Sequence, residues 1–228
     1  MIDNILQIIA RHHCCGCKEY GSLLCSSCIY NIKDEYTNTC INCGKLSSVG
    51  VCTDCQQKVS FQKGWCVGAR DEALKELIDR YKFSYAQAAH KPLTSLLHQT
   101  LPVLPKETTI VPVPTIGKHI RQRGYDHACL LAKRLAKQRN LPCKLLLRRN
   151  TNTVQREAVN AKERERQAKE AFKCAQKLNP NNIYLIVDDV ITTGATIRAA
   201  ARCLKQAGAE KIFIAAVARQ PLDVSEDL

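Results

Sequence analysis

Two neighbouring acids and a threonine-rich turn are the residues of this chain whose types and spacing could do chemistry. Asp188 and Asp189 directly follow the apolar segment 184–187, which predicts a buried strand, and the segment 192–196 (TTGAT) then leads into a helical pattern. Backbone N–H groups, threonine hydroxyls and the positive end of a helix can together surround a phosphate. Two carboxylates instead suit hydroxyl donors or a magnesium ion. The stretch therefore predicts a site for a ribose 5-phosphate, with the phosphate in the turn and the ring hydroxyls on the acids.

The cysteines indicate a second chemistry. The chain has 14 of them, and eight form C-x-x-C pairs: Cys14/Cys17, Cys25/Cys28, Cys40/Cys43 and Cys52/Cys55. Thiolates at this spacing can hold one tetrahedral ion, so four pairs supply two closed, structural zinc sites. We expect the first pair to join the second and the third to join the fourth, because each set then forms one zinc ribbon. Interleaved pairing is an alternative, as are Cys15 in place of Cys14 and His12 or His13 as a substitute ligand.

The elements that must position these residues alternate between helical and extended patterns. Apolar residues recur at helical spacing in 74–81, 128–135 and 197–204, and a charged stretch at 160–172 is also expected to be helical. Apolar segments at 109–114, 143–149, 184–187 and 211–218 predict strands. Such alternation predicts an α/β fold whose parallel sheet has helices on both faces and binds ligands at the carboxyl ends of its strands. We expect a zinc-ribbon domain at 1–60 and the α/β domain at 61–228.

Positive charge is concentrated in the middle of the chain. The formal net charge is +13, and residues 118–173 carry 16 lysines and arginines against 5 acids, whereas residues 1–66 carry 6 against 5. This excess indicates a polyanionic partner, either nucleic acid or a phosphate-rich small molecule, with a solvated helical face as the alternative. No apolar run approaches the length of a membrane span, and the start of the chain lacks a signal-peptide pattern. We therefore expect a cytoplasmic protein without membrane insertion.

The sequence LIVDDVITTGAT (185–196) resembles the PRPP-binding motif of type I phosphoribosyltransferases, in which two acids precede T-T-G-x-T. The resemblance implies a phosphoribosyltransferase-like parallel sheet, PRPP bound with Mg²⁺, and displacement of pyrophosphate. It implies that Asp188 and Asp189 are catalytic residues that hold the 2- and 3-hydroxyls, with Asp189 also helping a proton to leave. The implied PRPP-binding residues are Val187, Asp188, Asp189, Val190, Ile191, Thr192, Thr193, Gly194, Ala195 and Thr196.

Most of the chain also resembles the ComF family, in which a double zinc ribbon precedes a phosphoribosyltransferase-like domain. The segments VPVPTIGKHIRQRGYDHACLLAKRLA (111–136) and AVAR (216–219) match this pattern, as do Gln155, Arg164 and Phe172. The chain departs from it at Tyr125, Asp126 and His127, where the family commonly has F-N-Q, and at Gln167, near its usual Asn. Asp126 adds negative charge beside the region expected to hold pyrophosphate.

These resemblances lead to competing functional hypotheses. Basic residues would neutralise pyrophosphate or contact DNA: Lys118, Arg121, Arg123, Arg164 and Arg166. The ComF resemblance implies a cytoplasmic factor of natural transformation that binds single-stranded DNA and PRPP, with other DNA-uptake proteins as further partners. The alternative is a metabolic phosphoribosyltransferase that transfers ribose 5-phosphate from PRPP to an acceptor. A third hypothesis is that PRPP is only sensed and regulates contacts with DNA or protein.

Overall fold

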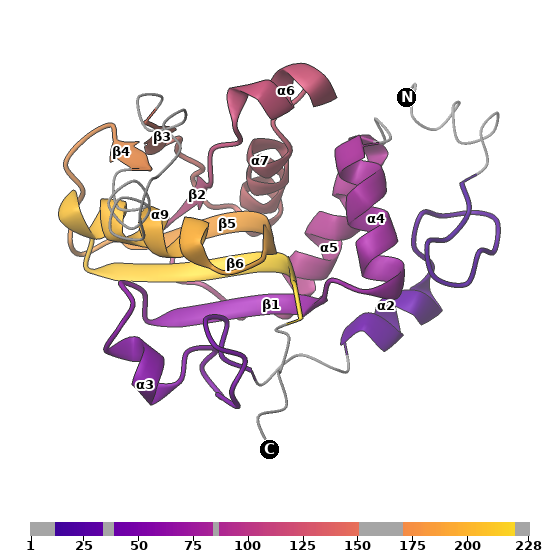
Figure 1. The fold of residues 1–228 in the computed structure, drawn as a ribbon, viewed down its shortest axis with the longest axis horizontal. Coiled ribbons are helices and arrows are strands. Elements are labelled where there is room, and N and C mark those ends of the chain that lie inside the picture. Colours follow the sequence, from indigo (N-terminus) through magenta and orange to yellow (C-terminus); the bar gives the residue numbers. More distant parts are fainter. Residues whose placement is uncertain (1–11, 34–38, 84–86, 151–170, 222–228) are drawn as a thin grey trace, which may run out of the picture.

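A four-stranded parallel sheet forms the centre of the molecule (Figure 1). The structure is a computed structural model, and it describes residues 12–33, 39–83, 87–150 and 171–221. The strand order is β1-β6-β5-β2. The strands are β1 (Lys63–Ala69), β2 (Thr108–Pro112), β5 (Ile183–Ile191) and β6 (Lys211–Arg219). The predicted α/β fold is therefore confirmed.

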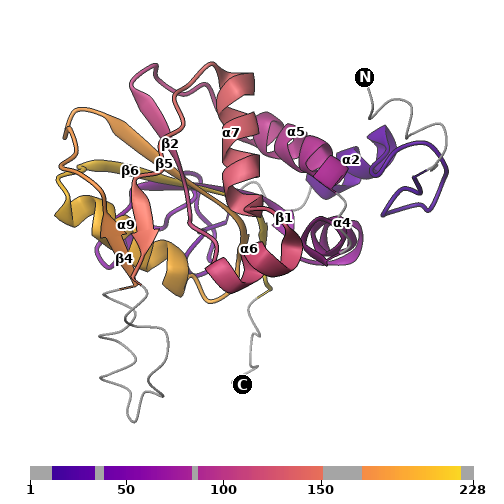
Figure 2. The same ribbon diagram turned by 90° about the horizontal axis from the view of Figure 1, so that it is seen from above.

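Helices cover both faces of this sheet, which explains why its central strands are almost continuously apolar. One face carries α4 (Glu72–Phe83), α5 (His90–Thr100) and α7 (His127–Arg139), and the other carries α9 (Ala195–Gln206). Figure 2 shows the strands between these two layers. Five consecutive residues of β5, from Ile183 to Val187, are buried because each side chain meets a helix layer whichever way it points. None of the helices in the described ranges is long and apolar enough to cross a bilayer.

The edge strand β2 accommodates a proline that a central strand would exclude. Pro112 is its last residue, and β2 pairs only with β5 in the four-stranded sheet. A short helix, α6 (Gly117–Arg123), follows β2, and the 3-10 turn η1 (Gln87–Ala89) precedes α5. A separate antiparallel pair joins β3 (Leu147–Arg149) to β4 (Phe172–Cys174).

Three sequence predictions differ from the structure in detail. The strand predicted to end before the acids continues through them, because residues 188–191 of β5 still pair with 216–219 of β6. The strand predicted at 143–149 is reduced to β3, although Cys143 forms a parallel bridge with Ile110. Of the helix predicted at 160–172, residues 160–170 lie outside the described ranges, and Phe172 belongs to β4.

The cysteine-rich segments lie against the β1 edge of the sheet, one on each face. The first ribbon comprises residues 12–33, ends in α2 (Ser26–Lys33) and shares a hydrophobic core with α4 and α5 (Figure 1). The second ribbon comprises residues 39–56, ends in α3 (Thr53–Gln56) and shares a hydrophobic core with α9. Gly50 of the second ribbon approaches β1 so closely that a Cβ there would lie 1.6 Å from the carbonyl oxygen of Gly64. Both ribbons thus share their cores with the sheet, while the domain boundary at residue 60 stays a prediction.

Candidate functional site

The two acids lie near the carboxyl end of β5 and occupy different environments. Neighbouring residues of a strand point to opposite faces of the sheet. Asp189 is only 3% exposed and faces the layer of α4 and α7, whereas Asp188 is half-buried on the other side. One Oδ of Asp188 accepts a hydrogen bond of 2.9 Å from the backbone N–H of Asp189. The pair is therefore one buried acid and one partly accessible acid.

Asp189 is engaged by a lysine and a histidine side chain from the helices above it. Its Oδ2 lies 2.8 Å from Nζ of Lys82 and 3.1 Å from Nε2 of His127. Burial alone would raise the pKa of Asp189, but His127 and Lys82 outweigh it and hold the pKa well below its usual range. The pKa of Asp188 is raised well above its usual range by burial and by the charge of Asp189. Asp189 is therefore held ionised. Asp188 is the acid whose ionisation a bound cation or hydroxyl group would change most.

The threonine loop beyond the acids is open to solvent. Thr192, Thr193 and Thr196 are exposed, and Gly194 caps α9 with a φ of 73°, a conformation that favours glycine. A Cβ on Gly194 would also lie 2.8 Å from an NH1 atom of Arg198, which donates a 2.9 Å hydrogen bond to the carbonyl of Thr193. No acid occupies the first turn of α9. Hydroxyls, a helix N-terminus and a guanidinium thus gather where the sequence predicted phosphate.

The basic residues predicted to bind pyrophosphate or DNA differ in their exposure and contacts. Lys118 and Arg121 of α6 are exposed, and Arg123 is half-buried, with NH1 3.1 Å from Nδ1 of His127 and its guanidinium carbon 5.0 Å from the ring centroid of Phe83. Arg123 therefore reaches the same imidazole that contacts Asp189. Arg164 and Arg166 lie outside the described residues.

The side chain of Asp126 is held by hydrogen bonds at a helix cap. It caps the N-terminus of α7, and its Oδ1 accepts hydrogen bonds from the backbone N–H of Cys129 at 3.0 Å and from the hydroxyl of Thr115 at 2.8 Å. Arg149 lies close enough to Asp188 and Asp126 for their charges to act on it, and its Nε donates to the carbonyl of Pro114 at 2.8 Å. Burial lowers the pKa of Arg149, and the two acids oppose that effect.

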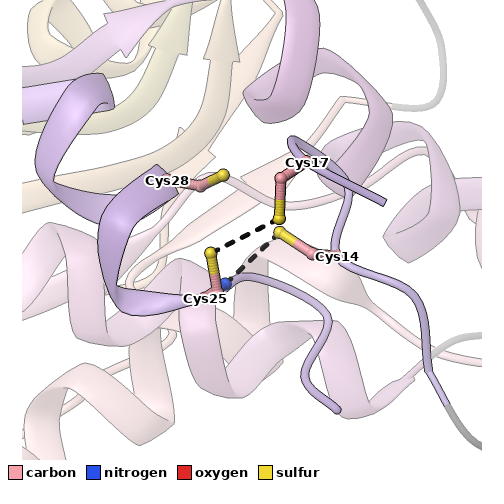
Figure 3. A group of neighbouring side chains, drawn as sticks. All are labelled: Cys14, Cys17, Cys25 and Cys28. Atoms are coloured by element: carbon pink, nitrogen blue, oxygen red, sulfur yellow. Dashed lines mark hydrogen bonds between the residues drawn. The ribbon is translucent and has the colours of Figure 1, made fainter. Parts of the chain in front are cut away.

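The first ribbon brings four sulfurs together as the spacing predicted. The Sγ atoms of Cys14, Cys17, Cys25 and Cys28 lie within 4.8 Å of one another (Figure 3). Cys17 and Cys25 are 3.7 Å apart, which fits the roughly 3.8 Å between sulfurs that a tetrahedral site with 2.3 Å Zn–S bonds requires. Burial would raise the pKa of Cys14, but backbone N–H groups lower it to about 6, whereas burial raises that of Cys15 to about 11. Cys14 rather than Cys15 belongs to this group of sulfurs, and these four residues could hold zinc.

The second ribbon repeats this arrangement with Cys40, Cys43, Cys52 and Cys55, whose sulfurs also lie within 4.8 Å of one another. The sulfurs of Cys43 and Cys52 are 3.5 Å apart, so this group also has the dimensions of a closed zinc site. We refer to the two groups as the first and second tetrads. The buried Arg219 of β6 donates to the carbonyls of Cys40 at 2.6 Å and Asn42 at 2.9 Å, and so ties the second tetrad to the sheet.

A cavity beside the first tetrad lies away from the threonine loop. It has a volume of about 590 Å³ and is bounded by the first tetrad, α2, the end of β1 and the start of α4. Asp71, Glu72 and Glu76 line it, and Lys18 in its wall already pairs with Glu76. This acidic lining disfavours phosphate. A smaller hollow of about 100 Å³ is lined by Lys82, Phe83, Gln122 and Arg123.

Several residues of the site carried no local sequence signal. Lys82, His127 and Arg149 surround the acids, and Asn42 and Arg198 adjoin the threonine loop. Four of these five residues are remote in sequence from the acids or the loop that they adjoin. The exception is Arg198, which lies one turn into α9, directly after the loop. That position is a signal that could have been used, because a basic residue in the first turn of a helix opposes the helix dipole unless an anion lies near.

Comparison with known proteins finds a matching domain family and relatives that are similar over most of the chain. The phosphoribosyl transferase domain model matches residues 122–227. The chain is 32% identical over 211 residues to competence protein F of Haemophilus influenzae, covering 86% of this chain and 90% of that protein. It is 29% identical over 205 residues to the DNA utilization protein YhgH of Escherichia coli, covering 84% and 88%. A glutamine PRPP amidotransferase from B. subtilis has 22% identity and a TM-score of 0.40, over 56% of this chain and 25% of that chain.

The sheet, the paired acids and the threonine loop define a domain of the phosphoribosyltransferase type, here combined with two cysteine tetrads that could hold zinc. The extent of the match to competence protein F makes the assignment more specific. The chain belongs to the ComF family of competence proteins.

Proposed function

We propose that this protein handles DNA during natural transformation, and that it binds PRPP at the threonine loop and single-stranded DNA on a neighbouring basic surface. The names of its relatives, competence protein F and DNA utilization protein, support the first part of the proposal. The observation that carries the second part is the exposure of Thr192, Thr193 and Thr196 at the N-terminus of α9, together with the half-buried Asp188.

In this proposal the ligand lies across the carboxyl end of the sheet. Thr192, Thr193 and Thr196 bind the 5-phosphate with the first N–H groups of α9. Asp188 binds ribose hydroxyls or the accompanying Mg²⁺, and its raised pKa falls when either partner arrives. Asp189 acts beside it by fixing Lys82 and His127. The hollow lined by Lys82 and Arg123 supplies positive charge for the pyrophosphate.

A basic surface for DNA lies on the β3–β4 pair and on α6. Arg148 and Lys173 stand directly opposite each other across the two strands, and both are exposed. Like charges in this position are destabilising unless an anion lies between them. Lys118 and Arg121 add two exposed cations on α6, and Phe83 exposes 60% of its surface beside Arg123, where a base could stack.

The proposal is tested by measuring binding and turnover in the same preparation. Fluorescence anisotropy with labelled single-stranded DNA should give an affinity that falls steeply with salt. Calorimetry should detect PRPP binding in the presence of Mg²⁺, and a pyrophosphate assay with a panel of nucleobases should detect no turnover.

The results of these assays distinguish the proposal from the competing functional hypotheses. Turnover with one base would establish the metabolic phosphoribosyltransferase and overturn the proposal. A DNA affinity that changes when PRPP is added would favour PRPP as a regulator of DNA handling. Failure to bind PRPP would remove the proposed role of the loop.

A further inference from the structure

The second tetrad and the threonine loop are joined by a chain of three hydrogen bonds. Nδ2 of Asn42 donates to Sγ of Cys55 at 3.2 Å, and Oδ1 of Asn42 accepts from NH1 of Arg198 at 3.1 Å. The same NH1 donates to the carbonyl of Thr193 at 2.9 Å. A guanidinium only donates and a thiolate only accepts, so the two partners fix the orientation of the Asn42 amide. A cysteine of the candidate metal site is thus connected to the backbone of the candidate phosphate loop.

Both ends of this series of hydrogen bonds are held by further contacts. Arg219 binds the carbonyls of Cys40 and Asn42, so the turn that carries Asn42 cannot shift without moving away from β6. On the loop side, Gly194 leaves room for Arg198, because a Cβ at this position would lie 2.8 Å from NH1 of that side chain. Asn42 Oδ1 itself lies 3.8 Å from the same Cβ position. The link therefore runs through close, defined contacts.

The first tetrad lacks such a link and provides an internal comparison. In the motif C-x-x-C, Asn42 occupies the position before the second cysteine, and the corresponding residue of the first tetrad is Gly16. A Cβ on Gly16 would lie 2.5 Å from Sγ of Cys28, so this turn leaves no space for an asparagine side chain. Only the second tetrad can thus contact the loop through this position.

We propose that Asn42 and Arg198 are positioning residues that couple the second tetrad to the threonine loop, so that zinc in the tetrad and phosphate in the loop strengthen each other's binding. Zinc fixes the turn of residues 40–43 and so keeps Asn42 in contact with Arg198. Arg198 in turn holds the carbonyl of Thr193 in place. Phosphate in the loop fixes the same contacts from the other side. Coupling of this kind is reciprocal in the two affinities. The part concerning PRPP rests on the proposed function, whereas the contact between loop and metal site does not.

The first test measures zinc release from the zinc-loaded full-length protein without PRPP, using a colorimetric chelator. Arg198→Ala should speed the release of one of the two zinc equivalents by roughly tenfold, as loss of an outer-shell partner typically does. Arg202→Ala is the matched control, because Arg202 lies one turn further along α9, is also half-buried, and has no hydrogen bond to the loop or the second ribbon among the described residues. Equal release from both variants would overturn the coupling.

The second test repeats the assay with Mg²⁺ and PRPP. PRPP should slow the release of one zinc equivalent in the natural sequence by about tenfold, a typical coupling factor, and leave the other unchanged. Asn42→Ala should remove this protection and weaken PRPP binding by the same factor. Asn42→Asp keeps an acceptor for Arg198 but loses the donor to Cys55, so it should also lose the protection. Circular dichroism checks that each variant is folded.

The two tests separate the two proposals. If the natural sequence binds no PRPP, the proposed function fails, and the coupling is then decided by the ligand-free comparison of Arg198→Ala with Arg202→Ala. If PRPP binds but protects both zinc equivalents equally, or protects one equally well in Asn42→Ala, the coupling is refuted while the proposed function stands.

Discussion

Replacing Asp189 by asparagine should destabilise the protein far more than removal of a surface ion pair would. The side chain of Asp189 is 5% exposed, and those of its partners Lys82 and His127 are only 15% and 8% exposed. Asparagine would leave the Lys82 ammonium group buried without its counter-charge, which typically costs about 3–5 kcal/mol. Because Lys82 retains some access to water, we expect about 3 kcal/mol. Urea denaturation at pH 7 with excess zinc measures this loss as a lower midpoint at unchanged m.

Asp79→Asn is the matched control for this prediction. Asp79 also contacts two cations, Arg70 at 2.7 Å and Lys75 at 3.0 Å, but these groups are considerably more exposed. Its loss should cost no more than about 1 kcal/mol. An Asp189→Asn protein within 0.5 kcal/mol of the natural sequence, or no less stable than Asp79→Asn, would show that the buried ion pairs contribute little, since differences of about that size are common for surface substitutions.

The same variant has a defined pH dependence. The pKa of Asp189 is lowered in the folded state, so its stabilising contribution is complete above the unfolded value of about 3.9 and disappears as the pH falls toward the folded value. The stability difference between the natural sequence and Asp189→Asn should therefore narrow below about pH 4. A difference that stays constant down to pH 3 would contradict the assigned ionisation of Asp189.

Further predictions concern the proposed ligands. Because the pKa of Asp188 is raised, its deprotonation should favour Mg²⁺ and PRPP, so their affinity should increase with pH above about 4, and Asp188→Asn should remove that increase in calorimetry. The double variant Asp188→Asn, Asp189→Asn should bind no PRPP yet retain two zinc equivalents by elemental analysis; unchanged PRPP affinity would refute the site. The Arg219→Met protein should release one zinc equivalent at least tenfold faster than the natural sequence, because loss of an outer-shell partner typically changes metal affinity by 10–100-fold. Release at the same rate from both proteins would show that the hydrogen bonds of Arg219 do not stabilise the second tetrad. Arg148→Ala with Lys173→Ala should lower the salt slope of single-stranded DNA binding by about 1.4, or 0.7 per phosphate contact; an unchanged slope would place the DNA elsewhere.

The parts of the site that could be predicted from the sequence are those encoded by residues close together in the chain. The spacing within C-x-x-C pairs predicts tetrads, and the structure brings together the two sets that the ribbon pattern favoured. The acids and the threonine loop are likewise contiguous, so their relation to a strand and the following helix was readable. The helices α4, α7 and α9 were readable because their apolar residues recur every three or four positions, whereas α5 was not predicted.

The contacts that join these local units could not be predicted in this way. Asn42 and Arg198 are 156 residues apart, and Arg219 and Cys40 are 179 residues apart, so no local spacing relates them. The strand β1 was also missed, because its burial depends on the two ribbons that lie against it rather than on a long apolar run. The extension of β5 through the acids depends on β6, which continues to pair as far as Arg219.

That extension determines how the two acids can act. Had the strand ended before Asp188, both carboxylates could have turned toward the threonine loop. Because residues 188 and 189 keep strand geometry, their side chains must point to opposite faces, and the helix layer supplies Lys82 and His127 on only one of them. One acid is consequently ionised and buried, while the other is half-buried and difficult to ionise without a partner. The pair therefore combines an ionised acid that contacts Lys82 of α4 and His127 of α7 with a second acid whose ionisation the proposed ligand would favour.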